Sequence, residues 1–427
     1  MTTVRVITLG CSKNTVDTEH LLAQLPSDRF TVSESGYADF LLINTCGFIG
    51  DAKEESVNAI LEAVEAKKRG GCGRLVVFGC LSQRYMDELP GEIPEVDAWF
   101  GARDLDPVVR YLGAEPSDPR SRYLTTPGKG YAYLKISEGC DRRCSYCAIP
   151  FIRGAHRSVP MEDLVEEATR LAAKGVKELI IIAQDTTYYG LDLYHRRALA
   201  ELLQRLSEVP GIEWLRIHYS YPADFPEDVL DQMAGNPKVC KYMDIPLQHI
   251  SDTVLDRMHR HVDGAWTRNL IRTMREKVPG VVLRTTMIVG HPGEDEADFD
   301  ELLSFVREAR FERLGAFTYS EEDGTYGALH FKDDIPQETK DARLDALMSL
   351  QSAISLDFNS SRVGSVERVL VDDCVDGMMV CRSQYESPEV DGEILVPAPS
   401  DRPAPVGSFI NVRITAAGEY DLAGEIV

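Results

Sequence analysis

Short apolar runs alternate with amphipathic helical patterns over most of the chain. In the first segment, three short β-branched runs lead into Cys11, Cys46 and Cys80. Between the second and third runs, residues 57–64 place apolar side chains at helical spacing. Strands that alternate with helices predict a parallel sheet. All three cysteines would then follow the carboxyl ends of its strands.

Sites in open α/β sheets form along the edge where the carboxyl ends of the strands meet. We therefore expect Cys11, Cys46 and Cys80 to converge and to form a three-thiolate cluster site. Buried cysteines also act as small hydrophobes, but three equivalent strand ends favour ligation. Cys72 precedes the third strand and is expected not to be a ligand. Asp51 with Glu54 predicts a capping box for the intervening helix.

A second series of strands and helices begins at Tyr131. Six βα units predict a partial barrel, open on one side, with its active site at the carboxyl ends of the strands. The predicted strands are Tyr133–Ser137, Glu178–Ala183, Trp214–Tyr219, Tyr242–Pro246, Leu283–Val289 and Leu314–Tyr319.

The loop after the first barrel strand carries Cys140, Cys144 and Cys147 at C-x3-C-x2-C spacing. Three thiolates on one short loop suit a metal or an iron–sulfur cluster. A tetrahedral structural zinc site would need a fourth ligand at a matching spacing, and none follows nearby. A cubane held by three cysteines leaves one iron open for a substrate or cofactor. We therefore predict a cluster, with structural or zinc-binding cysteines as the alternative.

Polar residues at other strand ends are candidates for the same active-site mouth. We predict cofactor contacts from Gln184, Arg216, Gln248, Gly290 and Glu294. Each of them also fits ordinary turn or capping chemistry. His218 and His249 invite acid–base roles, but a structural histidine is an equal alternative.

The final segment has a different pattern. A helical pattern from Pro336 to about Ser360 precedes five short alternating runs, which predict a small antiparallel β-barrel of OB-like kind. Such barrels often bind nucleic acid through a basic face. Residues 361–427 instead hold five Arg, no Lys, six Asp and six Glu, a formal charge of −7. We interpret Cys374 and Cys381 in this segment as structural.

Composition narrows the function classes further. Ten cysteines in a chain that starts directly in a strand, without an export signal, indicate a reducing cytoplasm and metal ligation instead of disulfides. No apolar run is long enough for a membrane span. The net charge of −23 disfavours bare phosphate backbones and favours basic partners, although acidity also serves solubility alone.

The cysteine loop resembles the signature of radical S-adenosylmethionine (SAM) enzymes. In that superfamily the open iron chelates SAM, and the reduced cluster cleaves it to a 5′-deoxyadenosyl radical. The resemblance places Tyr146 near the adenine. It also likens the glycine-rich stretch at Gly290 to a strand end that contacts SAM.

Nearly the whole chain resembles the methylthiotransferase family. The resemblance implies an N-terminal three-cysteine domain (1–121), a radical SAM partial barrel with a linking helix (122–360) and a C-terminal TRAM barrel (361–427). One family branch modifies adenosine in transfer RNA, and another modifies an aspartate of small-subunit ribosomal protein uS12. Ser12-Lys13-Asn14 after the first cysteine and Gln184-Asp185 after the second barrel strand look like the uS12 branch.

The resemblance implies two 4Fe–4S clusters and SAM. The cluster on Cys140, Cys144 and Cys147 would make the radical that abstracts hydrogen from the β-carbon of the aspartate. The cluster on Cys11, Cys46 and Cys80 would deliver sulfur bearing a methyl group. The expected partners are uS12 and an electron donor such as flavodoxin or ferredoxin, without dominant nucleic-acid binding. A transfer RNA enzyme and a non-catalytic iron–sulfur carrier are the alternatives.

Overall fold

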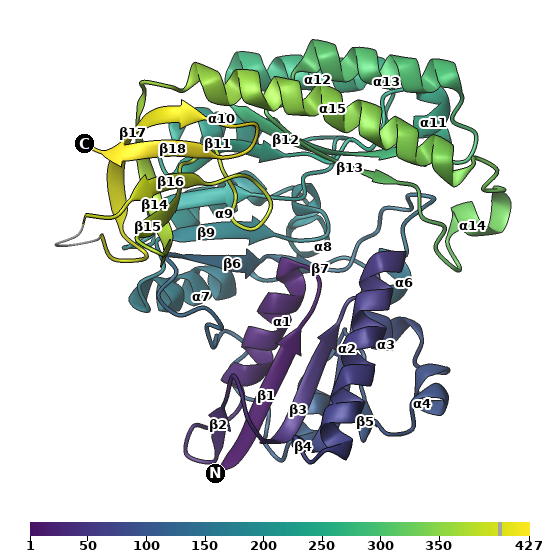
Figure 1. The fold of residues 1–427 in the computed structure, drawn as a ribbon, viewed down its shortest axis with the longest axis vertical. Helices are drawn as coiled ribbons and strands as arrows, with labels where there is room; N and C mark the ends of the chain where they lie inside the picture. The colour runs from purple at the N-terminus through teal and green to yellow at the C-terminus, as the bar shows by residue number, and fades with distance from the viewer. Residues whose placement is uncertain (400–403) are drawn as a thin grey trace.

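A computed structural model describes residues 1–399 and 404–427. The chain forms a five-stranded sheet, a six-stranded sheet and a closed five-stranded barrel (Figure 1). This confirms the predicted α/β class with a C-terminal β-barrel. Within the described part of the chain, every helix is too short or too polar to cross a membrane.

The first sheet is parallel and has the strand order β2-β1-β3-β4-β5. Its strands are β1 (Thr2–Thr8), β2 (Phe30–Val32), β3 (Ala38–Thr45), β4 (Cys72–Gly79) and β5 (Ala98–Trp99). Its helices are α1 (Ser12–Ala23), α2 (Gly50–Lys68), α3 (Cys80–Arg84), α4 (Leu89–Glu92) and α5 (Asp106–Tyr111). Buried aliphatic side chains form a core on each face of this sheet.

The predicted capping box at the start of α2 is wrong. The helix already begins at Gly50, and its N-cap, Ile49, has no side chain that can accept a hydrogen bond from the backbone. Asp51 therefore lies inside the first turn, where a carboxylate still interacts favourably with the helix dipole.

The second sheet is parallel and has the order β13-β12-β11-β10-β9-β6. All six predicted strands are present, and the two outer strands do not pair, so the barrel is open as expected. The strands are β6 (Tyr131–Lys135), β9 (Glu178–Ile182), β10 (Trp214–Ile217), β11 (Val239–Asp244), β12 (Val282–Val289) and β13 (Arg313–Thr318). A two-stranded ribbon, β7 (Ser137–Glu138) with β8 (Arg157–Ser158), brackets the cysteine loop.

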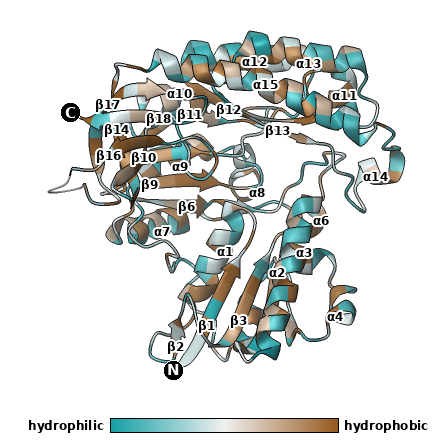
Figure 2. Ribbon diagram, in the orientation of Figure 1, coloured by the Kyte–Doolittle hydropathy of each residue, from teal (hydrophilic) through white to brown (hydrophobic). Residues whose placement is uncertain are grey.

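Helices cover the outer face of the open barrel and bury a large aliphatic core against it. The core includes residues of α7 (Met161–Ala173), α9 (Leu199–Ser207), α10 (Asp228–Gly235), α12 (Gly264–Lys277), α13 (Glu296–Ala309) and α15 (Gln337–Ser361). The remaining helices of this segment are α6 (Ile149–Arg153), η1 (Thr186–Tyr188), α8 (Leu191–Tyr194), α11 (Asp252–Arg257) and α14 (Tyr326–His330). Figure 2 shows hydrophobic residues concentrated on the strands and polar residues distributed over the helices. The inner face packs against Val16 of α1 and Leu370 of the C-terminal barrel.

The C-terminal barrel closes through the order β14-β15-β16-β18-β17. Its strands are β14 (Val366–Val375), β15 (Met378–Arg382), β16 (Ile394–Pro397), β17 (Phe409–Ala417) and β18 (Leu422–Ile426). The pairings are antiparallel except for β16 with β18. Cys381 lies in its core and Cys374 is exposed.

Buried ion pairs join this barrel to the inner face of the open barrel. Glu178 on β9 lies between Arg216, at 2.7 Å, and Arg382, at 2.9 Å, and all three side chains are fully buried. Glu386 lies between Arg313 and Arg362 in the same way. Although burial raises its pKa, the two arginines hold the pKa of Glu386 at about 2. The two barrels therefore meet through a fixed set of charge pairs.

Candidate functional site

The barrel cysteines share one turn of chain after β7. A Cβ on Gly139, which has a φ of +77°, would lie 2.1 Å from the Ala155 carbonyl oxygen, so only glycine fits there. Cys140, Cys144 and Cys147 lie close enough that their charges influence one another. Burial raises the pKa of Cys140 to about 12, although the backbone hydrogen bond from Arg142 acts in the opposite direction. Thiols in this environment ionise only with a compensating cation or metal.

A buried arginine supplies positive charge beside this loop. Arg260 Nη1 donates to Cys144 Sγ at 3.5 Å and to Tyr146 Oη at 3.4 Å. Its guanidinium also lies over the Tyr221 ring, 4.2 Å from the centroid. Among residues 1–399 and 404–427, no carboxylate forms an ion pair with Arg260, and its Nε has no hydrogen-bond partner. A buried, uncompensated cation beside three thiols fits an anionic cluster–thiolate group.

Sequence reasoning missed Arg260 because it lies between α11 and α12 and not at a strand end. Its signal in the sequence is weak, since the stretch His259-Arg260-His261 resembles a polar loop. The contact depends on a long side chain that reaches back across the mouth of the barrel.

The three strand-end cysteines of the first sheet converge as predicted. A Cβ on Gly10 would lie 2.6 Å from Cys46 Cβ, so the turn before Cys11 packs directly on the cysteine after β3. Burial raises the pKa of Cys46, and it raises the pKa of Cys80 to about 11. The charge of Cys11 raises both. Ligation by these thiols stays a prediction, with a donor set suited to a cluster.

Cys72 is the first residue of β4, whereas Cys80 follows the last. Its side chain belongs to the aliphatic core beside α2. The structure thus places Cys72 away from the edge where the other three cysteines meet.

One buried charge network links the two groups of cysteines. Arg153, at the end of α6, donates from Nε to Cys80 Sγ at 3.3 Å and from Nη2 to Asn14 Oδ1 at 2.6 Å. Its Nη1 donates to Asp17 Oδ2 at 2.6 Å and to Glu138 Oε2 at 3.3 Å. Arg153 thus reaches from the barrel loop to a predicted ligand of the first sheet.

Gln184 and Lys135 extend this network into the barrel. Gln184 Nε2 donates to Glu138 Oε1 at 2.7 Å, and its own Oε1 is buried without a partner among the described residues. Lys135 pairs with both Asp17 and Glu138. Gln184 thus lies at the mouth, as predicted, and retains one free acceptor.

Replacing Arg153 with glutamine should destabilise the fold by about 3 kcal/mol, because it leaves the buried Asp17 and the half-buried Glu138 with only Lys135 as a cation. Urea unfolding of the chain without cofactors would measure the loss. Arg272→Gln, on the exposed side of α12, removes the same charge and should change the free energy of unfolding by less than about 0.5 kcal/mol. Equal effects of the two substitutions would contradict a structural role for the network.

A cavity of about 730 Å³ lies between the two cysteine regions. Phe48–Asp51, just after Cys46, line one side, and Tyr146 of the cysteine loop lines another. Gln248, whose φ is +76°, also lines it. Tyr146 and Gln248 are therefore brought together at the mouth of the barrel.

Three other predicted cofactor residues contact parts of the protein itself. A Cβ on Gly290 would meet Lys340 Cγ at 2.4 Å, so this residue packs against α15. Glu294 is buried, accepts from the Gly290 N–H at 2.8 Å and pairs with Arg343 at 2.8 Å. The Arg216 guanidinium donates hydrogen bonds to Glu178 and to the carbonyl oxygens of Gln384 and Ser383. The structure does not support a cofactor contact by Arg216.

His218 and His249 are both buried, and burial lowers the pKa of each to about 3. His218 shares a hydrogen bond of 2.8 Å with Ser387 of the C-terminal barrel. His249 accepts from the Ser251 N–H and faces Glu294 at 3.6 Å. These contacts favour the structural interpretation of both histidines.

Glu294 gives a pH-dependent stability that can be measured. Burial raises its pKa to about 7, above the ordinary value of 4.5. The folded state therefore keeps its proton to a higher pH, and stability from this group falls by roughly 3 kcal/mol as pH rises from 4.5 through 7. We expect the free energy of unfolding of Glu294→Gln, relative to that of the unchanged chain, to increase as pH rises from 4.5 to 7. Above pH 7 the difference between the two chains should stay constant. A difference between the two chains that is constant with pH would contradict this.

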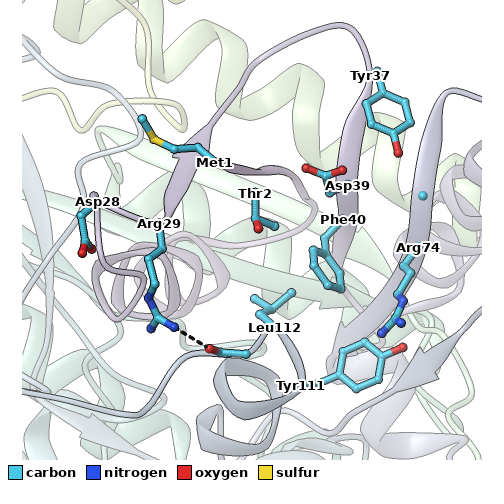
Figure 3. Close-up of a pocket in the computed structure, with 12 residues that line it drawn as sticks. Met1, Thr2, Asp28, Arg29, Tyr37, Asp39, Phe40, Arg74, Tyr111 and Leu112 are labelled. Atoms are coloured by element: carbon cyan, nitrogen blue, oxygen red, sulfur yellow. Dashed lines mark hydrogen bonds between the residues drawn. The ribbon is translucent and has the colours of Figure 1, made fainter.

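The structure also contains a cavity of about 960 Å³ remote from this chemistry (Figure 3). Met1, Thr2 and Asp39, at the amino ends of β1 and β3, line it together with Arg29 and Arg74. The cysteines follow the opposite ends of these strands. We therefore assign the candidate site to the smaller cavity between the cysteine regions.

Comparisons with known proteins agree with this arrangement. Residues 134–306 match the Radical SAM superfamily, residues 363–427 match the TRAM domain, and residues 3–101 match the Uncharacterized protein family UPF0004. Proteins named "Ribosomal protein uS12 methylthiotransferase RimO" match the whole chain. The one from Porphyromonas gingivalis is 54% identical over 99% of both chains. The one from Bacteroides fragilis is 51% identical over 100% of this chain and 99% of its own.

This chain belongs to the RimO methylthiotransferase family. It is a radical SAM transferase, with an iron–sulfur cluster and SAM as cofactors. Among solved structures, the radical SAM methyltransferase TsrM from Kitasatospora setae covers 77% of this chain, at 14% identity and a TM-score of 0.58. Its alignment spans 74% of its own length and shows a shared fold.

In the described ranges 1–399 and 404–427, no three His, Cys, Asp or Glu side chains are spaced to hold a single metal ion. Thiolates that ligate a cubane bind separate irons, so they need a wider spacing than the ligands of one ion. The two cysteine groups, with Arg260 and Arg153 beside them, fit cluster ligation on their donor chemistry.

Proposed function

We propose that this chain transfers a methylthio group to the β-carbon of an aspartate in small-subunit ribosomal protein uS12. The observation that carries the proposal is the cavity of about 730 Å³ bounded by the loop after Cys46 and by the loop that holds Tyr146. A single cavity between two sets of thiols suits a reaction that needs both a radical and a sulfur donor. The names of the full-length relatives support the same substrate.

We assign one 4Fe–4S cluster to Cys140, Cys144 and Cys147 and a second to Cys11, Cys46 and Cys80. When bound, the first would supply reductive cleavage of SAM, and the second would supply sulfur to the substrate. An unactivated C–H bond is too inert for removal by an acid or base, which is why radical chemistry is required. A reduced flavodoxin or ferredoxin is the proposed electron donor.

The side chains of this protein would hold and shield the reacting groups. Arg260 would offset the negative charge of the barrel thiolates, and Tyr146 would pack beside the bound cofactor. Arg153 would fix the distance between the two cysteine regions, because it contacts Cys80 and Glu138 at once. The surrounding protein would exclude water, which otherwise quenches a reactive intermediate.

Charge favours a protein substrate over transfer RNA. The whole chain carries −23 and residues 361–427 carry −7, so a phosphate backbone is repelled and a basic ribosomal protein is attracted.

A substrate competition tests this proposal. The reconstituted chain receives reductant, SAM, uS12 and transfer RNA together without oxygen, and mass spectrometry then searches both for a methylthio adduct. An adduct on an aspartate of uS12 supports the proposal. An adduct on adenosine, or SAM cleavage without either adduct, overturns it.

A further inference from the structure

One side of the open barrel exposes an unpaired strand edge. Within the described residues, β13 pairs with β12 alone. The Tyr319 N–H donates to the Val289 carbonyl oxygen at 2.8 Å, so alternation along the parallel ladder turns the odd-numbered residues of β13 toward β12. The backbone groups of Leu314, Ala316 and Thr318 therefore face away from the sheet. Such an edge is a template for another extended chain.

Two neighbouring cavities lie along β13. One, of about 360 Å³, is lined by Arg313, Leu314 and Gly315 together with residues of the C-terminal barrel. The next is the candidate active-site cavity, which residues 316–322 line. Ten consecutive residues, 313–322, thus border a groove that the two cavities form, and the six of them that make up β13 span about 20 Å.

The groove is negatively charged at both ends. Asp51 and Glu321 line it at the cysteine end, and Glu389 and Asp421 line it at the other. All four residues are exposed and form no ion pair within residues 1–399 and 404–427. The Glu389 carboxylate accepts hydrogen bonds from the hydroxyls of Tyr131, at 3.3 Å, and Tyr133, at 2.9 Å. The cations that line the groove are already paired: Arg284 with Asp244, Arg313 with Glu386, and Lys340 with Asp333.

We propose that a basic, extended segment of the protein substrate adds to the free edge of β13 as an extra strand. This inference rests on the proposed function and specifies how the substrate is held. Backbone hydrogen bonds to Leu314, Ala316 and Thr318 would set its register, and the acidic groups at the two ends would select basic side chains. The register would bring one substrate residue into the cavity between the cysteine regions.

Hydrogen exchange tests the docking directly. The reconstituted full-length chain is compared with and without uS12, and we expect slower amide exchange in residues 313–319 with uS12 bound. Bound uS12 without protection there overturns the proposal. The competition experiment is read separately: a uS12 adduct without strand protection defeats the edge docking alone, and neither adduct nor binding defeats both.

Ala316→Pro removes an N–H that faces away from β12 and therefore spares the sheet. We expect it to raise the KM for uS12 about tenfold. Ala316→Ser, which keeps the N–H, is the matched control and should leave the KM within twofold. An unchanged KM in the proline variant contradicts the proposal.

If the proline variant does not fold, Glu321→Gln combined with Asp421→Asn provides the second test. This pair should weaken uS12 binding most at low salt. Affinity that is independent of these charges would also overturn the proposal.

Discussion

Alanine in place of Cys144 is expected to abolish reductive cleavage of SAM. The Cys144 Sγ accepts a hydrogen bond from Arg260 Nη1 at 3.5 Å and lies 3.8 Å from the Tyr221 hydroxyl oxygen. Two thiols cannot hold the proposed cluster, because a missing ligand leaves a second iron open to water and to loss. The reconstituted variant should release less than about one-thousandth of the deoxyadenosine made by the unchanged chain, the drop of about 4 kcal/mol expected when catalytic machinery is removed.

The readout should include iron content as well as product. We expect the variant to retain the iron of one cluster and to keep its fold, since Cys144 is only partly buried. Arg143→Ala provides a neighbouring control, because this exposed side chain lies outside the proposed ligand set. SAM cleavage that persists in Cys144→Ala at more than a few per cent would refute the assignment of the barrel cysteines.

Alanine in place of Cys46 is expected to separate the two halves of the reaction. SAM cleavage should continue, because the barrel loop keeps its three thiols. Methylthio transfer to uS12 should fall below detection, because the proposed second cluster loses a ligand. Liquid chromatography would quantify deoxyadenosine, and mass spectrometry would quantify the adduct in the same samples.

Cys72→Ala is the matched control for this experiment. Cys72 lies in the same sheet and is buried, but it begins β4 instead of following a strand. Its replacement removes a core side chain and should cost some stability while both products still form. Methylthio transfer retained by Cys46→Ala would remove the second cluster from the mechanism.

The sequence predicted the fold well because the decisive signals are local. Short apolar runs between amphipathic helices define both parallel sheets, and the strand-end rule correctly anticipated that Cys11, Cys46 and Cys80 would meet. The error at the start of α2 came from placing the boundary two residues late, since the N-cap is Ile49 and not Asp51.

Long-range side-chain contacts were out of reach for the same local signals. Arg153 and Arg260 contact the cysteine regions from a helix end and a loop, where nothing in the adjacent sequence distinguishes them from surface arginines. The predicted cofactor contact of Arg216 fails because the strand-end rule gives the position of a residue along the chain and does not give the direction in which its long side chain extends. Its partner, Glu178, lies at the opposite end of β9 from the active-site mouth.

The contact of two carboxylates with four arginines between the two barrels limits how this architecture can be rearranged. Glu178 is buried between two cations, Arg216 from the open barrel and Arg382 from the C-terminal barrel. Cutting the chain before β14 would strip Glu178 of one cation and leave Arg313 without its carboxylate. A chimera that carries a foreign C-terminal barrel inherits the same deficit unless the graft brings Arg382 and Glu386 equivalents with it. A functional recombinant at this junction therefore needs both members of each buried charge pair, and the C-terminal barrel cannot be exchanged independently of the open barrel.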